Sequence, residues 1–186
     1  MSNNKTMVIN LFGGPGTGKS TCAAYIFSRL KMMGINAELV TEAAKDLTWE
    51  ESFKNLKDQI YVFGKQAHRL FRCADQVDVI VTDSPIFLST IYNQDDDIDV
   101  ELHNLVLKVI DKYNNINIVL KRVKPYNPVG RTQTEAESDA ISNNIKSCLD
   151  GENFDYYEFD GNIEGCEDIL AKVVKTIQIL EKLKHA

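Results

Sequence analysis

The chain has 186 residues, of which 44% are hydrophobic and 26% are charged, and its formal net charge is −6. These proportions are close to the globular average, and a chain of this length buries about 70% of its unfolded surface, so intrinsic disorder is excluded as the main state. The acidic balance argues against a dedicated nucleic-acid-binding protein, although it leaves room for a local basic groove. We expect a single domain over residues 1–186.

The cysteines and the N-terminus bear on compartment and metal binding. The four cysteines lie far apart, at Cys22, Cys73, Cys148 and Cys166. Without C-x-x-C spacing they predict buried, reduced thiols rather than a zinc site, which fits a cytoplasmic protein. The N-terminus is short and polar, and the apolar run that follows it is too short to span a bilayer, so no membrane partner is expected.

The first part of the chain predicts a strand, a helix and a second strand. An apolar run at 7–12 predicts a strand buried on both faces, as in a parallel sheet. From 19 to 33, apolar residues recur at i, i+3, i+4 and i+7, which predicts an amphipathic helix ended by Gly34. A second strand is predicted at 37–41, and a loop is expected from there through Trp49.

The middle of the chain continues the alternation. An amphipathic helix is predicted over 58–74 and a third strand over 77–82. An apolar stripe between 102 and 113 predicts another helix, and a fourth strand follows at 116–120.

The last third begins with a polar stretch at 121–133, which predicts a loop. Thr134 and Glu137 have the spacing of a capping box and predict the start of a helix. A short fifth strand at 156–159 and a final helix over 166–180 complete the chain. Strands separated by helices imply parallel pairing, so we expect a three-layer α/β sandwich.

A complete G-x-x-x-x-G-K-[ST] motif lies between the first strand and the first helix. Its glycines let the loop wrap tightly around phosphate groups, and backbone N–H groups at a helix N-terminus favour an anion. Lys19 is expected to reach the β- and γ-phosphates of ATP, and the Ser20 hydroxyl to coordinate Mg²⁺. The predicted nucleotide-binding residues are Gly13, Gly14, Pro15, Gly16, Thr17, Gly18, Lys19, Ser20 and Thr21.

Asp83 ends the third strand and is expected to hold Mg²⁺ or its waters together with Ser20; the alternative is a turn cap. The residue after it is Ser84 rather than the Glu of a mechanical ATPase. Ile86 occupies the position where a G-protein has the Gly of D-x-x-G. Because no residue is evident that would activate water, the pattern favours transfer to a bound hydroxyl over hydrolysis.

Three residues are candidates for the acceptor side of the site. Glu42 lies at the end of the second strand, where parallel sheets bind ligands, and a carboxylate there can accept the proton of an attacking hydroxyl. Its alternatives are an N-cap or an ion pair with Lys45. Gln66 and Arg69 lie one turn apart on the second predicted helix, where they would hold a base edge and an anion or the Glu42 carboxylate; the alternative is a solvated helix flank.

The stretch 121–133 is basic within an acidic protein. Arg122 and Arg131 are candidates for closing on the phosphates, where arginines stabilise transferred charge and exclude water. The alternative is an ordinary polar loop.

Taken together, five stretches resemble a phage-type small P-loop kinase of the AAA-like group that also contains the ribosylnicotinamide kinase domain. They are 11–21, 40–47, 58–66, 81–85 and 130–135. The resemblance implies ATP, Mg²⁺, a sheet order of 2-3-1-4-5, an arginine-bearing lid at about 121–133, and the host cytoplasm if the gene belongs to a bacteriophage.

The chain is also similar to deoxynucleoside kinases, which carry Glu-Pro-Val at the end of strand two with the Glu as general base. Glu42 matches that Glu, whereas Ala43 and Ala44 replace Pro-Val. Their Glu-Arg-Ser at strand three is only loosely echoed by the segment that begins at Asp83. The phage group further resembles kinases that act on 5-hydroxymethyluracil in DNA during thymidine hypermodification, a form of DNA modification.

We therefore expect an ATP-dependent phosphotransferase, in which Lys19, Glu42, Asp83, Arg122 and Arg131 are catalytic. The preferred acceptor is 5-hydroxymethyluracil in DNA, with a local basic channel formed by Lys65, Arg69, Arg72, Lys121, Arg122, Lys124 and Arg131. The alternatives are a nucleoside, nucleotide or ribosylnicotinamide kinase, and a nucleotide-dependent regulatory ATPase. The oligomeric state is open, a dimer included.

Overall fold

The computed structural model describes residues 5–128 and 133–184. Five parallel strands form a sheet in the order β2-β3-β1-β4-β5, which confirms the expected order. The strands are β1 Met7–Phe12, β2 Ala37–Val40, β3 Val79–Thr82, β4 Asn114–Lys121 and β5 Tyr156–Asp160. All six residues of β1 are buried, as expected for the central strand of a covered parallel sheet.

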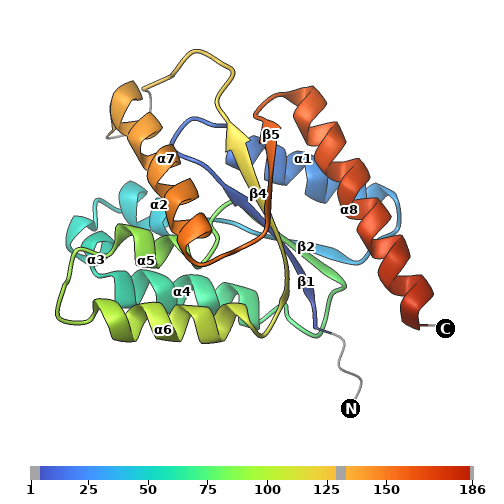
Figure 1. Ribbon diagram of the computed structural model, residues 1–186, viewed down its shortest axis with the longest axis horizontal. Coiled ribbons are helices and arrows are strands. Elements are labelled where there is room, and N and C mark those ends of the chain that lie inside the picture. The colour runs from blue at the N-terminus through green and yellow to red at the C-terminus, as the bar shows by residue number, and fades with distance from the viewer. Residues whose placement is uncertain (1–4, 129–132, 185–186) are drawn as a thin grey trace.

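Helices cover both faces of this sheet (Figure 1). They are α1 Lys19–Met32, α2 Ala43–Trp49, α3 Phe53–Lys57, α4 Gln59–Phe71, α5 Leu88–Tyr92, α6 Asp99–Ile110, α7 Glu135–Gly151 and α8 Ile163–Lys184. Helices α1 and α8 pack on one face, where Ile9 and Leu11 contribute to the core. Helices α4 to α7 contribute to the core on the opposite face, together with Val8 and Phe12.

Three short helices lie where the sequence predicted none. The segment through Trp49 contains α2, which begins at Ala43, so the prediction of a loop there is wrong. Ala43 and Leu47 are both buried, but a single i, i+4 pair is too short a pattern to indicate a helix from sequence. The short helices α3, which begins at Phe53, and α5, which follows Pro85, were not expected either.

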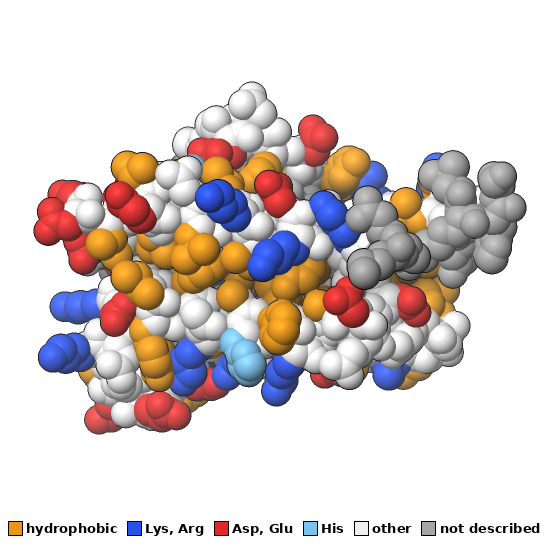
Figure 2. Space-filling view, turned by 90° about the horizontal axis from the view of Figure 1, so that it is seen from below, with side chains coloured by type: hydrophobic (Ala, Val, Ile, Leu, Met, Phe, Trp, Pro, Cys, Tyr) orange, Lys and Arg blue, Asp and Glu red, His pale blue; other side chains and the backbone are white. Residues whose placement is uncertain are grey.

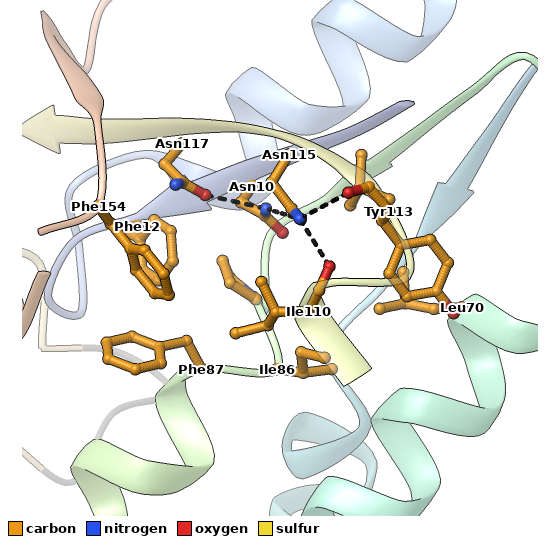
Figure 3. Close-up of a pocket in the computed structure, with 12 residues that line it drawn as sticks. Asn10, Phe12, Leu70, Ile86, Phe87, Ile110, Tyr113, Asn115, Asn117 and Phe154 are labelled. Carbon is orange, nitrogen blue, oxygen red and sulfur yellow. Dashed lines mark hydrogen bonds between the residues drawn. The ribbon is translucent and has the colours of Figure 1, made fainter. Parts of the chain in front are cut away.

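Strand β4 begins at Asn114, two residues earlier than predicted. The reason is a polar contact inside the sheet, shown in Figure 3. The Asn10 amide of β1 donates to the side-chain oxygens of Asn115 and Asn117 on β4, each at 3.0 Å. Paired with one another, these amides are tolerated in a strand that packs against apolar side chains.

The capping box at the start of α7 is confirmed. The Thr134 hydroxyl accepts a hydrogen bond from the Glu137 N–H, and the Thr134 N–H donates to the Glu137 carboxylate at 2.6 Å. These contacts, the backbone N–H first, hold the pKa of Glu137 below its usual value. Within the part of the chain that the structure describes, no helix combines the length and hydropathy that crossing a membrane requires.

We expect Thr134→Ala to lower the Tm by about 2–4 °C, because a lost N-cap typically costs about 1 kcal/mol. Thr48→Ala is the matched control, since the Thr48 hydroxyl only donates back to Ala44 O within α2. Thermal unfolding followed by circular dichroism measures both variants. Equal Tm values for the two would show that the capping box does not stabilise α7.

Candidate active site

The candidate residues come together because parallel strands end at one edge of the sheet. Strand β1 leads into the loop 13–18, β2 into Glu42, β3 into Asp83 and β4 into Arg122. In the sheet order these strands are neighbours, with β1 between β3 and β4. The order therefore places Asp83 on one side of the loop and Arg122 on the other.

The loop after β1 contains backbone conformations that only glycine adopts easily. Gly13 has φ of 139° and Gly18, the N-cap of α1, has φ of 97°. The Lys19 ammonium turns back over the loop and donates to Gly13 O at 2.7 Å and Gly14 O at 3.0 Å. The loop thus has the turn that the motif predicts, with Lys19 at its mouth.

Helix α7 holds this loop, a contact that sequence reasoning missed. The Gly14 N–H donates to Ser142 Oγ at 2.9 Å, and the Ser138 hydroxyl donates to Pro15 O at 2.6 Å. A Cβ on Gly14 would lie 2.2 Å from Ser138 O. More than 120 residues separate the partners, so no local sequence signal points to them.

Gly161, directly after β5, forms the other wall of the loop. Its N–H donates to Lys121 O at 2.8 Å, and an added Cβ would lie 1.9 Å from Thr17 O. The close approach of two backbones explains why this position is glycine. A glycine at the end of a strand is a signal that could have drawn attention to it.

Asp83 is buried, with 4% of its surface exposed. Among the described residues, its Oδ1 has no hydrogen-bond partner. A buried carboxylate oxygen without a donor is the kind of group that a cation or its bound water satisfies. Ser20 lies exposed in the first turn of α1, the helix that follows β1, and β1 is the neighbour of β3 in the sheet.

These two oxygens fit Mg²⁺. The described residues contain no group of three or more His, Cys, Asp or Glu that could hold a metal. Mg²⁺ in nucleotide sites needs fewer, because phosphates and waters complete its shell around one or two protein ligands. Ser20 and Asp83 therefore suit a metal that arrives with a nucleotide.

Glu42 is the N-cap residue of α2, but its side chain makes no capping hydrogen bond, so its alternative role as a cap is not realised. Burial raises the pKa of this carboxyl group above its usual value. Lys19 and Lys45 act in the opposite direction, and Asp83 adds to the rise. Glu42 therefore lies within the electrostatic reach of both Lys19 and Asp83.

Gln66 and Arg69 contact the segment around Glu42. Gln66 is 2% exposed and its Oε1 accepts from the Ala43 N–H at 2.9 Å. Arg69 donates to Thr41 O at 3.0 Å and forms an ion pair with Asp46. Of the two predicted partners of Arg69, an anion or the Glu42 carboxylate, the carboxylate is thus replaced by that of Asp46.

Tyr92, the last residue of α5, is a further neighbour of Glu42 that the sequence did not indicate. The residue is 40% exposed, but partial burial of its hydroxyl, with a smaller contribution from the Glu42 charge, raises the pKa of Tyr92 to about 12. A tyrosine hydroxyl is protonated at neutral pH even at its usual pKa, so that of Tyr92 can act as a hydrogen-bond donor. No sequence signal was available because α5 itself was not predicted.

The base of the expected lid is tied to α7. The Arg122 side chain is 11% exposed and pairs with Glu135 and Asp139. Its guanidinium carbon lies 5.5 Å from the centre of the Tyr126 ring. Arg131 lies outside the described residues, so the lid role of both arginines stays a prediction.

Comparison with known proteins agrees with this architecture. Residues 8–165 match an AAA domain family, and the chain belongs to it. No curated protein sequence matches significantly. Deoxyadenosine kinase from M. mycoides with bound dATP superposes with a TM-score of 0.58 at 18% identity, covering 92% of this chain and 100% of that one.

The same M. mycoides enzyme, with products dCMP and a flexible dCDP bound, gives a TM-score of 0.55 at 20% identity, covering 92% of this chain and 99% of that one. At these identities the likeness shows the shared fold alone, a five-stranded parallel sheet covered by helices on both faces.

We expect Gly161→Ala to lower the Tm by about 3–10 °C and to weaken ATP binding about tenfold, because the new Cβ overlaps Thr17 O and forces the loop to shift. Gly151→Ala is the control, since a Cβ there meets nothing within 4 Å. Calorimetric titration and thermal unfolding provide the measurements. Tight ATP binding by Gly161→Ala would mean that this wall does not shape the loop.

Proposed function

We propose that the protein is an ATP-dependent phosphotransferase that moves the γ-phosphate to a hydroxyl group of a nucleoside-type acceptor. One observation carries the proposal: a complete phosphate loop has two carboxyl groups beside it, the buried Asp83 with an unpartnered Oδ1 among the described residues, and the partly buried Glu42, which makes no capping hydrogen bond. One suits Mg²⁺ and the other suits the acceptor hydroxyl. The fold shared with a deoxyadenosine kinase supports the same class.

The residues divide the chemistry among them. Backbone N–H groups of the loop and Lys19 bind the phosphates, and Ser20 and Asp83 hold Mg²⁺. When bound, Mg²⁺ neutralises charge on the phosphate oxygens. Glu42 accepts a hydrogen bond from the acceptor hydroxyl and orients it toward the γ-phosphorus.

As transfer proceeds, the bond from the acceptor oxygen to the γ-phosphorus forms and the bond from that phosphorus to the leaving oxygen of ADP breaks. The hydroxyl proton passes to Glu42 and later to solvent. The raised pKa of Glu42 brings its basicity closer to what accepting this proton requires.

The charges around the site bear on which acceptor is bound. Duplex DNA binding depends largely on neutralising phosphates with uncommitted cations. Three members of the expected basic channel are paired with carboxylates instead: Arg69 with Asp46, Arg122 with Glu135 and Asp139, and Lys121 with Glu158. The face shown in Figure 2 is seen from below the view of Figure 1, away from the edge where the strands end, and there too basic side chains are interspersed with acidic and hydrophobic ones.

This charge pattern favours a free nucleoside-type acceptor, and 5-hydroxymethyluracil in DNA remains the specific acceptor that the family resemblance implies. An assay with γ-labelled ATP decides between them. It compares 5-hydroxymethyluracil DNA, free nucleosides, ribosylnicotinamide and nucleoside monophosphates with a reaction without acceptor. ADP release that does not depend on any acceptor would instead indicate a regulatory ATPase.

We expect Lys19→Ala to lower turnover by at least about 10³, because the lysine stabilises charge on the transferring phosphate. Lys31→Ala, at an exposed position in the last turn of the same helix, is the control and should react normally. Steady-state transfer rates measure both. Full activity of Lys19→Ala would contradict the assignment of the phosphate loop.

We expect Glu42→Gln to leave ATP affinity within a few-fold and to lower kcat by about 10²–10⁴, the usual range for a lost general base. Single-turnover transfer with saturating acceptor is the measurement. Glu50→Gln, on the exposed C-cap of the same helix, is the control. Near-normal transfer by Glu42→Gln would leave Asp83 as the leading candidate for the base.

The Tm of Glu42→Gln shows whether this variant folds normally. The pKa of Glu42 is higher in the folded protein than in the unfolded chain. The folded protein therefore keeps its full stability below the unfolded pKa and loses stability as the pH rises through the folded pKa and the carboxyl group ionises. Removing the charge should therefore raise the Tm of the nucleotide-free protein at pH 7 and change it little at pH 4. A lower Tm at pH 7 would mean that lost activity reflects misfolding.

A further inference from the structure

Gln66 lies on α4, with its side chain directed at the end of β2 rather than at solvent. Its Oε1 accepts from the Ala43 N–H at 2.9 Å, and its Nε2 donates to Thr41 O at 3.4 Å. Ala43 and Thr41 are the two residues on either side of Glu42. The one side chain thus contacts the backbone immediately before and immediately after the candidate base.

These two contacts require opposite polarity. The N–H of Ala43 needs an acceptor and the carbonyl of Thr41 needs a donor, and a carboxamide supplies both from adjacent atoms. The contacts also define which way the amide of Gln66 points. An apolar side chain supplies neither group, and a carboxylate supplies only the acceptor.

The contact with Ala43 has a second consequence. Ala43 is the first residue of α2, and the N–H groups of a first helical turn lack partners within the helix. An N-cap side chain accepts from the N–H of the second or third helical residue, so the Glu42 side chain would not satisfy the Ala43 N–H. Gln66 satisfies it instead, and the Glu42 side chain itself makes no capping hydrogen bond.

Further contacts join α4 to the segments that carry Glu42 and Asp83. Arg69, one turn further along α4, donates to Thr41 O and pairs with Asp46, so α4 contacts the Glu42 segment on both sides. The Gln66 Nε2 also lies 3.5 Å from Thr82 Oγ1, which accepts from the Ser84 N–H at 3.1 Å. The amide therefore lies between the segments that carry Glu42 and Asp83.

We propose that Gln66 is a positioning residue that holds the backbone on both sides of Glu42 and leaves the Glu42 carboxylate directed at the acceptor, rather than a residue that reads the acceptor base. This inference rests on the proposed function, because it gives Glu42 the role of base. It predicts that losing the amide impairs transfer and leaves ATP binding intact.

Gln66→Met tests it, because Met keeps the length and apolar bulk of the side chain and removes both polar atoms. Gln59→Met is the matched control: Gln59 is on the same helix, is also buried, and donates to Leu56 O at 3.0 Å, away from Glu42. We expect a single-turnover rate about 10–100-fold lower for Gln66→Met, with an ATP Kd within a few-fold of wild type and a near-normal Gln59→Met.

A double-mutant cycle separates positioning from binding. If Gln66 acts through Glu42, then adding Gln66→Met to Glu42→Gln lowers the rate by less than about threefold. If Gln66 instead reads the acceptor base, its loss adds fully in that background and raises the acceptor KM. The second result would overturn the proposal.

Hydrogen exchange at the Ala43 amide tests the contact without any activity measurement. Exchange should be faster in Gln66→Met than in wild type and unchanged in Gln59→Met, and equal exchange in all three would overturn the inference. A wild-type protein that transfers phosphate to no acceptor would overturn the proposed function instead. The two failures are thus distinguished.

Discussion

The site depends on one constraint, which is that all five strands run parallel with β1 at the centre. Parallel strands bring their carboxyl ends to one edge, so the phosphate loop, Glu42, Asp83 and Arg122 meet although they are far apart in sequence. The glycines of the loop then allow contacts with α7 and with Gly161 that any larger residue would prevent.

The same edge holds carboxyl groups whose surroundings disfavour them in the folded protein. Asp83 Oδ1 is buried without a partner among the described residues, and burial of Glu42 disfavours its charged form. Both groups would be more stable in water. Natural proteins keep such groups at functional sites, where a ligand or a reaction makes use of them. Arg122 and Gln66, by contrast, have polar partners within the chain: Arg122 pairs with Glu135, and Gln66 accepts from the Ala43 N–H.

Long, periodic elements could be predicted from the sequence, and short ones could not. The central strand, α1 and the capping box of α7 follow from local patterns of six or more residues or from a paired motif. Helices α2 and α5 have seven and five residues, too few for a period to be evident. Their helical form is decided by what they pack against and, for α2, by the Gln66 amide from another helix.

The sequence by itself indicated the phosphate-loop motif, which includes Lys19 and Ser20, and the alternating α/β architecture, because each is evident from residues close together in the chain. Only the tertiary structure decided that Arg69 pairs with Asp46, that Gln66 holds the Glu42 segment, and that Gly161 lies against Thr17. Those contacts join residues 23 to 144 positions apart, and the choice of partner depends on distance in space and on which polar groups remain unpaired.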